Sequence, residues 1–250
     1  MKLHYQELGS GETVVILHGL FGSGDNWLGP ARDLGSSHHV IVPDMPNHGS
    51  SPHGTSMRYP VMAAEIAAFL EHVAPVHLVG HSMGGKVALA LALDFPELVR
   101  TITIVDICPV RYQPSHESIL EGMRAVADAA PDRRADADTL LAEYVAAKAV
   151  RAFLLKSYEA RSARWKLNVP LIHADYDHIL DWPYADDSSV DRPCLLIYGG
   201  RSQYATASGR EAMKRLAPAV KMHCVQDAGH WVHAEQPRET VEAIRGFIAP

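Results

Sequence analysis

The chain has 250 residues, 47% hydrophobic and 21% charged, and is therefore long enough to bury one sizeable core. Its formal net charge of −6 gives no electrostatic reason to expect nucleic acid or an anionic membrane as a partner. Three cysteines without C-x-x-C spacing argue against a disulfide framework or a zinc knuckle, and predict mostly buried thiols in a reducing compartment. We find no signal-peptide pattern and no run of 18 apolar residues, and so expect a cytoplasmic protein without a membrane segment.

Short apolar runs rich in β-branched residues predict strands that are buried on both faces. Runs of this kind begin at Thr13 (TVVILHG), His38 (HHVIVPDM), Pro75 (PVHLVGHS), Arg100 (RTITIVDI), Cys194 (CLLIYGG) and Val220 (VKMHCVQDAGH). Helical patterns cover residues 60–73, 84–95, 209–218 and 236–249. The alternation of strands and helices predicts an α/β fold with a mostly parallel central sheet flanked by helices.

The alternation stops between Cys108 and Val190. Two amphipathic, helix-like segments occupy residues 115–130 and 136–158, and the charged loop PDRRADA joins them. We expect a helical cap, residues 108–190, inserted into a core formed by residues 1–107 and 191–250.

The motif most directly linked to chemistry is G-x-S-x-G at Gly80-His81-Ser82-Met83-Gly84, between a predicted strand and a predicted helix. This context is typical of a nucleophile elbow, in which glycines permit a sharp turn that raises a serine hydroxyl at a helix N-terminus. The alternative is an ordinary glycine-rich helix entry. We predict that Ser82 is a nucleophile and that the N–H of Met83 contributes to an oxyanion hole.

A serine nucleophile needs a base, and His230 in DAGHWVH follows the last predicted strand, where the chain order of such enzymes places it. For His233, three residues later, we expect helical packing rather than metal binding, and no metal site is predicted. For His18 and His48 we expect structural hydrogen bonds, and for His81 no obvious chemical role. The remaining candidates are assigned by default to the surface or to the core: His38, His39, His53, His72, His116 and His223.

The segments HGLFGS, DMPNHGSSP, GHSMGGK and DAGHWVHAEQP together resemble the α/β-hydrolase superfamily over the whole chain. The set NHGSSP, HSMGGK, DICPV, FLLKSY, NVP and GHWVHAE more narrowly resembles YbfF-type bacterial esterases and their eukaryotic abhydrolase-domain relatives. The resemblance implies an α/β-hydrolase fold that hydrolyses esters or thioesters, with acyl-coenzyme A derivatives and short acyl esters as candidate substrates. It also implies that the N–H of Leu20 is the second oxyanion donor and that Phe21 lines the acyl pocket.

Many α/β-hydrolases carry the triad acid in a G-x-x-D turn, but this chain reads Gly199-Gly200-Arg201-Ser202 at that place. Asp106 ends the run RTITIVD, at the sheet edge where ligands bind in open α/β folds, and the order Ser82, Asp106, His230 is preserved. We therefore predict that Asp106 is the acid, with Asp227 and Asp191 as rivals. Ser202 would then hydrogen-bond to the histidine–aspartate pair as a fourth member, and Tyr204 would form a pocket wall.

Two basic features have more than one interpretation. The stem of Lys86 is expected to pack while its ammonium finds a carboxylate, and a catalytic lysine is the alternative. The segment from Arg151 to Lys166 concentrates basic residues that could meet coenzyme A phosphates, although a solvated helix face explains them as well.

Together these features predict a cofactor-free serine hydrolase that cleaves small-molecule esters or thioesters through an acyl-enzyme. A carbon–carbon bond hydrolase, a cofactor-free haloperoxidase or a non-catalytic ligand receptor are the alternatives on the same fold. A haloalkane dehalogenase is disfavoured because Ser82 is not a carboxylate. The sequence does not indicate acyl length, leaving group or oligomeric state.

Overall fold

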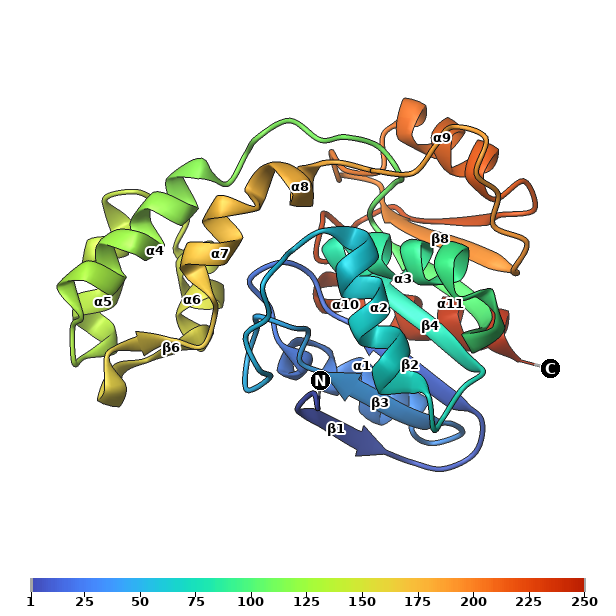
Figure 1. Cartoon of the computed structure of the whole chain (residues 1–250), viewed down its shortest axis with the longest axis horizontal. Coiled ribbons are helices and arrows are strands. Elements are labelled where there is room, and N and C mark those ends of the chain that lie inside the picture. The colour runs from blue at the N-terminus through green and yellow to red at the C-terminus, as the bar shows by residue number, and fades with distance from the viewer. Residues whose placement is uncertain (1, 250) are drawn as a thin grey trace.

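The computed structural model describes residues 2–249, and a seven-stranded sheet forms its centre (Figure 1). The strand order is β1-β3-β2-β4-β5-β8-β9, and only β1 runs antiparallel to its neighbour. The strands are β1 (Tyr5–Leu8), β2 (Thr13–Leu17), β3 (His39–Pro43), β4 (Val76–His81), β5 (Val99–Val105), β8 (Cys194–Gly199) and β9 (Lys221–Val225). The predicted α/β-hydrolase fold with a mostly parallel sheet is confirmed.

Helices cover both faces of the sheet because alternate strand residues point to opposite sides. Leu17, Leu78 and Ile104 pack with α2 (Tyr59–Leu70), α3 (Met83–Asp94) and α9 (Ala207–Leu216). Ile16, Val79 and Val105 pack with α1 (Leu28–Leu34) and α11 (Pro237–Ile248). The chain also contains α10 (Val232–Glu235) and the short 3₁₀ turns Gly24–Trp27 and Pro96–Leu98.

The segment between β5 and β8 forms a helical cap to one side of the sheet (Figure 1). Its elements are α4 (Glu117–Ala129), α5 (Arg134–Ala142), α6 (Lys148–Leu154), the antiparallel pair β6 (Tyr158–Glu159) and β7 (Arg164–Trp165), α7 (Val169–Ala174) and α8 (Tyr176–Leu180), with 3₁₀ turns at Leu155–Ser157 and Ala160–Ser162. The boundaries at residues 108 and 190 stay a prediction.

The expectation of one helix over residues 136–158 is wrong. Helix α5 ends at Ala142, and α6 starts at Lys148. The guanidinium of Arg151 donates to the carbonyls of Val145 and Ala146 and to the carboxylate of Asp138. A side chain therefore satisfies carbonyls that a continuous helix would have used, and the break turns α6 toward the sheet.

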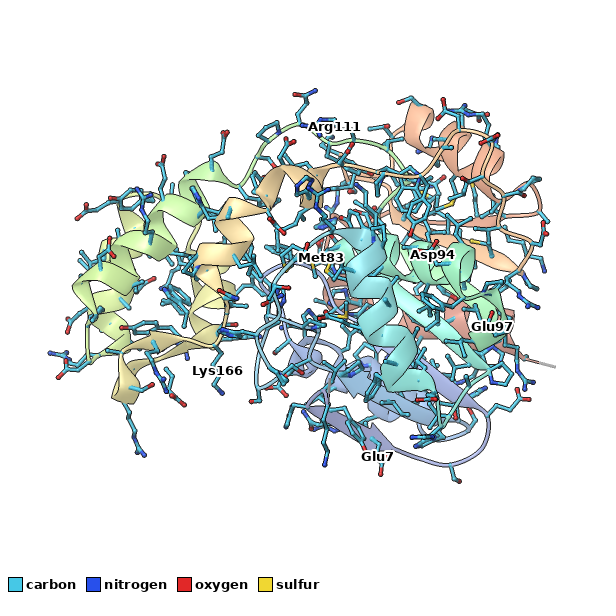
Figure 2. The ribbon with its side chains drawn as sticks, in the orientation of Figure 1. Glu7, Met83, Asp94, Glu97, Arg111 and Lys166 are labelled. Atoms are coloured by element: carbon cyan, nitrogen blue, oxygen red, sulfur yellow. The ribbon has the colours of Figure 1, made fainter. Side chains whose placement is uncertain are left out.

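Polar contacts hold the cap on the core, from the buried interior out to the surface. The phenol of Tyr59 on α2 donates to the carbonyl of Ile179 at 2.6 Å, and the carboxylate of Asp175 accepts from the N–H of Met57 at 2.7 Å. Arg111 lies on the linker that enters the cap (Figure 2). At the surface it pairs with Asp177, and its guanidinium lies 3.6 Å from the carboxylate of Asp181. These contacts tie both linkers and α8 to one another and to α2.

The expectation that the ammonium of Lys86 pairs with a carboxylate is wrong. The side chain is 1% exposed, and its ammonium donates to the carbonyls of Leu180 at 3.0 Å and Asp181 at 2.8 Å, at the end of α8. Its nitrogen also lies 4.8 Å from the ring centre of Tyr112. Helix-terminal carbonyls and an aromatic face thus take the place of a carboxylate, and burial lowers the pKa of Lys86 to about 7.

The three cysteines are unpaired, and Cys108 and Cys194 are buried, as predicted. Burial raises the pKa of each of these two thiols to about 12, which keeps them protonated. Within residues 2–249, no helix combines the length and apolar character needed to cross a membrane.

Candidate active site

Ser82 lies at a sharp turn between β4 and α3. Its φ of 53° and ψ of −121° are strained for a residue with a side chain, which costs on the order of 1–3 kcal/mol. A Cβ on Gly80 would lie 2.3 Å from the carbonyl oxygen of Gly84, and one on Gly84 would lie 2.3 Å from that of Leu17. Only glycine fits at either place, so the turn that presents the Ser82 hydroxyl requires both glycines of the motif.

Ser82 lies between the start of α3 and the HGLFG loop. Met83 is the first residue of α3, so its N–H has no partner within the helix. The HGLFG loop packs closely against the elbow. A Cβ placed on Gly19 would lie only 3.1 Å from Cβ of Ser82. In the turn closed by Gly22 N–H and the carbonyl of Gly19, Phe21 has a φ of 63°. Leu20 lines the same two cavities as Ser82, and the oxyanion role of the Leu20 and Met83 N–H groups stays a prediction.

His18 holds the HGLFG loop in place through two hydrogen bonds. Its Nε2 accepts the N–H of Met45 at 2.9 Å, so its Nδ1 carries hydrogen and donates to the carbonyl of Gly19 at 2.8 Å. Burial lowers the pKa of His18 to about 4 and that of His48 to about 3. Nδ1 of His48 likewise donates to the carbonyl of Pro46 at 2.9 Å, so the structural hydrogen bonds expected of both histidines are confirmed.

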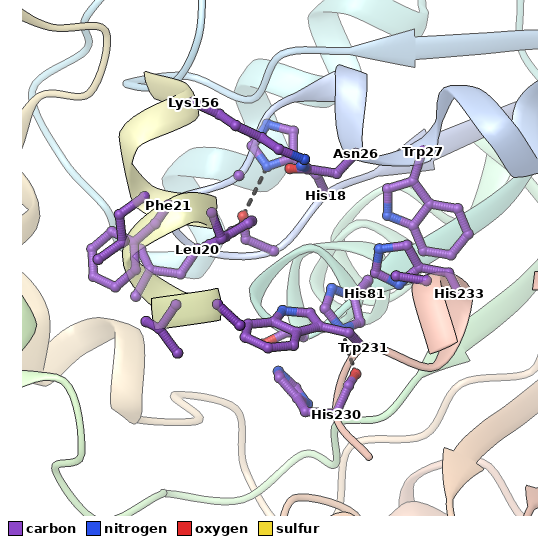
Figure 3. A pocket seen from close by; sticks show the side chains of 18 of the residues that line it. His18, Leu20, Phe21, Asn26, Trp27, His81, Lys156, His230, Trp231 and His233 are labelled. Carbon is purple, nitrogen blue, oxygen red and sulfur yellow. Dashed lines mark hydrogen bonds between the residues drawn. The ribbon is translucent and has the colours of Figure 1, made fainter. Parts of the chain in front are cut away.

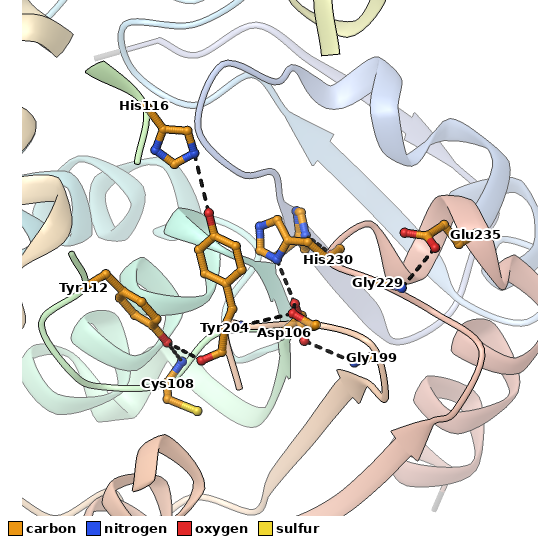
Figure 4. A network of polar contacts seen from close by, with 11 residues as sticks. Asp106, Cys108, Tyr112, His116, Gly199, Tyr204, Gly229, His230 and Glu235 are labelled. Atoms are coloured by element: carbon orange, nitrogen blue, oxygen red, sulfur yellow. Dashed lines mark hydrogen bonds and ion pairs between the residues drawn. The ribbon is translucent and has the colours of Figure 1, made fainter. Parts of the chain in front are cut away.

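Asp106, at the end of β5, is fully buried and has a φ of 53°. Its Oδ2 lies 2.7 Å from Nδ1 of His230 and also accepts the hydroxyl of Ser202, while Oδ1 accepts the N–H of Gly199 at 3.1 Å (Figure 4). Because a carboxylate only accepts hydrogen bonds, Nδ1 of His230 carries a hydrogen, and Nε2 remains free to accept a proton.

The rivals of Asp106 lie elsewhere. Asp227 is exposed in the loop after β9, and Asp191 is exposed before β8, at the opposite end of that strand from Ser202. The structure therefore brings together Asp106, His230 and Ser202 and leaves the other two carboxylates apart.

Two further histidines lie beside His230. The ring of His81 is 4.8 Å from that of His230, and its Nε2 donates to the carbonyl of His230 at 2.9 Å. His233 is buried on α10 and stacks on Trp27 at 4.1 Å, in agreement with the expected packing role. Burial, reinforced by neighbouring histidines, holds the pKa of His81 well below its usual value and lowers that of His233 to about 3. Both rings are neutral at physiological pH.

Ser82 lies in the wall of two cavities. The first has a volume of about 660 Å³ and is bounded by Phe21, by α6 and by the loop carrying His230 (Figure 3). The second, of about 640 Å³, extends along Lys86 and α8. Leu20, Ser82, His116 and Tyr204 line both cavities. The two cavities therefore meet at Ser82.

Sequence reasoning missed His116, which lies in the wall of both cavities rather than at an incidental surface or core position. It also missed Trp231, which lines the first cavity and contacts Phe153 of α6 with ring centres 5.7 Å apart. Within the basic segment, Lys156 lines the first cavity, whereas Arg151 is engaged in the cap. The position of Trp231 directly after His230 was the one available signal.

The chain matches the sequence profile of the family described as alpha/beta hydrolase fold over residues 12–237. The chain belongs to this family. Esterase YbfF of Escherichia coli is 36% identical, with 94% of this chain and 92% of the relative aligned. The sn-1-specific diacylglycerol lipase of Mus musculus is 34% identical, with 95% and 81% aligned. The resemblance to YbfF-type esterases and their abhydrolase-domain relatives is thereby confirmed.

A solved structure described as a marine microorganism esterase superposes with a TM-score of 0.94 over 99% of both chains, at 33% identity. The cap arrangement is thus shared with a protein of known structure and not only the sheet. Together with the sequence relatives, this similarity makes the chain an α/β-hydrolase of the esterase and lipase type.

Proposed function

We propose that the chain is a serine esterase and thioesterase that works through an acyl-enzyme, with Ser82 as nucleophile, His230 as base and Asp106 as acid. The observation that carries the proposal is the pair formed by buried Asp106 and half-buried His230, which lies in the same site as a strained serine elbow. A serine hydroxyl becomes an effective nucleophile only when a base of this kind removes its proton.

In the proposed reaction, Oγ of Ser82 attacks the substrate carbonyl while Nε2 of His230 takes the hydroxyl proton. The N–H groups of Leu20 and Met83 meet the oxyanion, where losing one donor typically costs about 10²–10³ in rate. His230 then returns the proton to the departing alcohol or thiol. Water, activated by the same histidine, cleaves the acyl–Ser82 bond, so the side chains present supply every proton transfer without a cofactor.

Ser202 is proposed as a fourth member of this group. Its hydroxyl occupies the turn where a family acid is often found, and it donates to Asp106 while accepting the N–H of Tyr204 at 3.1 Å. A small hydroxyl at this position leaves room for a carboxylate to reach His230 from β5. Its contribution is one neutral hydrogen bond, worth about 0.5–1.5 kcal/mol.

The proposed substrates are carboxylic esters and acyl-coenzyme A thioesters. The two cavities that meet at Ser82 offer space for an acyl chain on one side and a leaving group on the other. Lys156, exposed at the first cavity, is the basic residue of the cap segment best placed to meet a phosphate of coenzyme A. The reducing cytoplasm, where acyl-coenzyme A is made, remains the proposed location.

A substrate screen tests the proposal: p-nitrophenyl esters and acyl-coenzyme A thioesters of graded chain length, with the Ser82→Ala protein as blank. We expect turnover of both classes by the wild type and none above blank by the variant. Lys156→Gln should raise KM for the thioesters while leaving KM for the uncharged esters unchanged. Absence of turnover together with absence of fluorophosphonate labelling would instead indicate a ligand receptor.

A further inference from the structure

Tyr204 lies against the imidazole of the proposed base. The two rings are stacked, with centres 3.9 Å apart and planes inclined by 20°. The phenol therefore covers one face of His230, and the centre of the His81 ring lies 4.8 Å from that of His230. Tyr204 therefore contacts the imidazole of His230 directly, in addition to lining the cavities.

The backbone of Tyr204 is fixed from the core. Its N–H donates to the hydroxyl of Ser202, which itself donates to Asp106. Its carbonyl accepts the phenol of Tyr112 at 3.0 Å, and that phenol also accepts the N–H of Cys108 at 2.9 Å. The acid and the stacked ring are thus held by one set of hydrogen bonds (Figure 4).

The phenol end of Tyr204 is held from the cap. The hydroxyl of Tyr176 on α8 accepts the N–H groups of Ser115 and His116, so its own hydrogen is directed to Nδ1 of His116 at 2.9 Å. Nε2 of His116 then carries a hydrogen and donates to the hydroxyl of Tyr204 at 3.5 Å. Burial lowers the pKa of His116 to about 4, consistent with a neutral ring in this arrangement.

The charged and titratable groups that face His230 are few. Asp106 pairs with its Nδ1, and the other titratable side chains close to the ring are those of Tyr204, His81, His116 and His233. The three histidine neighbours are neutral at working pH, because burial lowers the pKa of each far below 7. Asp25, Lys156 and Glu235 also line the first cavity but are exposed, so water screens their charges from His230. The stacked phenol face therefore acts on the charge of His230 at closer range than these side chains do.

We propose that Tyr204 is a positioning residue whose ring face stabilises the imidazolium of His230 and holds the imidazole in line with Asp106, with His116 and Tyr176 fixing the ring from the cap. The negative face of an aromatic ring attracts a cation, and the attraction grows when the cation is shielded from water. The proposal rests on the serine hydrolase function above, because the imidazolium forms as Ser82 loses its proton.

The test compares Tyr204→Leu, which removes the ring, with Tyr204→Phe, which keeps the ring and removes the hydroxyl. The measurement is the pH profile of kcat/KM with a p-nitrophenyl ester from pH 5 to 8. We expect Tyr204→Leu to lose about 5- to 30-fold on the high-pH plateau, and its acid limb to move about half a unit or more toward lower pH. The loss should accordingly be smaller at pH 5 than at pH 8. The Tyr204→Phe profile should keep the wild-type midpoint.

An NMR titration of the His230 ring protons gives a second readout that does not depend on turnover. In a Ser82→Ala background, Tyr204→Leu should move the midpoint of the His230 titration to lower pH, and Tyr204→Phe should not. Circular dichroism and fluorophosphonate labelling of Ser82 in the otherwise wild-type Tyr204→Leu protein check that the fold and the nucleophile persist.

The outcomes separate the two proposals. A wild-type protein in which Ser82 is neither labelled nor needed for turnover would overturn the serine hydrolase function. A protein with normal labelling, in which Tyr204→Leu and Tyr204→Phe share the wild-type midpoint in both measurements, would overturn the role of the ring and leave that function standing. A uniform loss at all pH values would also overturn it, because such a loss indicates only a damaged pocket.

Discussion

Replacing Asp106 by asparagine is the sharpest perturbation of the proposed charge network, because the carboxylate accepts from three donors and is fully buried. Asparagine offers one accepting oxygen and one donating nitrogen. With the oxygen toward Gly199, the NH₂ group faces Nδ1 of His230 and forces that nitrogen to give up its hydrogen. Nε2 then carries the hydrogen and can no longer take the proton of Ser82.

The opposite orientation of the asparagine keeps the histidine tautomer but places the NH₂ group against the N–H of Gly199. Two donors facing each other in a buried site cost about 1–3 kcal/mol. In both orientations the negative charge that stabilises the imidazolium is lost. We therefore expect kcat to fall by about 10³–10⁴, or about 4–5.5 kcal/mol of transition-state stabilisation.

The assay is kcat for a p-nitrophenyl ester, with thermal melts to verify folding. Asp227→Asn is the matched control, since it makes the same chemical change three residues before His230 on an exposed side chain, and kcat should stay within about twofold of the wild type. Ser202→Ala removes one neutral hydrogen bond and should cost about tenfold. Near-normal kcat in Asp106→Asn, combined with a severe loss in Asp227→Asn or Ser202→Ala, would refute the assignment of the acid.

Three other changes probe the turn, the cap contact and the cavity. Gly80→Ala should lower the melting temperature and abolish turnover, because its Cβ would lie 2.3 Å from the carbonyl oxygen of Gly84; an unchanged melt in calorimetry would contradict this. Burial lowers the folded pKa of Lys86 to about 7 from 10.5, so the unfolded state binds more protons between those values. Relative to Lys86→Met, the wild type should then gain about 1.4 kcal/mol of stability per unit as pH rises from about 7.5 to 9.5, whereas a constant difference in urea melts would show that the lysine stays charged. Val150→Trp should reduce kcat/KM at least tenfold more for acetyl-coenzyme A than for p-nitrophenyl acetate, because Val150 lines the first cavity, where Lys156 is proposed to meet the coenzyme; equal losses would place the coenzyme elsewhere.

The strands and the position of Asp106 could be predicted because each follows from a local signal. Near-continuous apolar runs mark strands buried on both faces, and the residue after such a run lies at the carboxyl edge of the sheet. Edge strand β1 was missed because its residues alternate between exposed and half-buried and include no apolar run. Helix α1 was missed because LGPARDL is only seven residues long and includes a proline.

The cap was harder to predict because its details depend on contacts between distant residues. The break between α5 and α6 is stabilised by Arg151, and nothing in the surrounding alanine-rich sequence opposes a helix there. Lys86 finds its partners 94 and 95 residues away, on backbone carbonyls that carry no sequence signal. The contact of His116 with Tyr204 likewise spans 88 residues. Side chains that meet only after the cap has packed cannot be paired from spacing alone.

The most direct test of the central claim is the mass of the protein trapped during turnover. After rapid acid quench of the reaction with a p-nitrophenyl ester, intact mass spectrometry and peptide mapping should find the acyl group on the peptide carrying Ser82, and a burst of p-nitrophenol should accompany it. The Ser82→Ala protein should show neither the adduct nor the burst. An acyl group on a different residue, or undiminished turnover by the Ser82→Ala protein, would contradict the proposal that hydrolysis proceeds through an acyl-Ser82 intermediate.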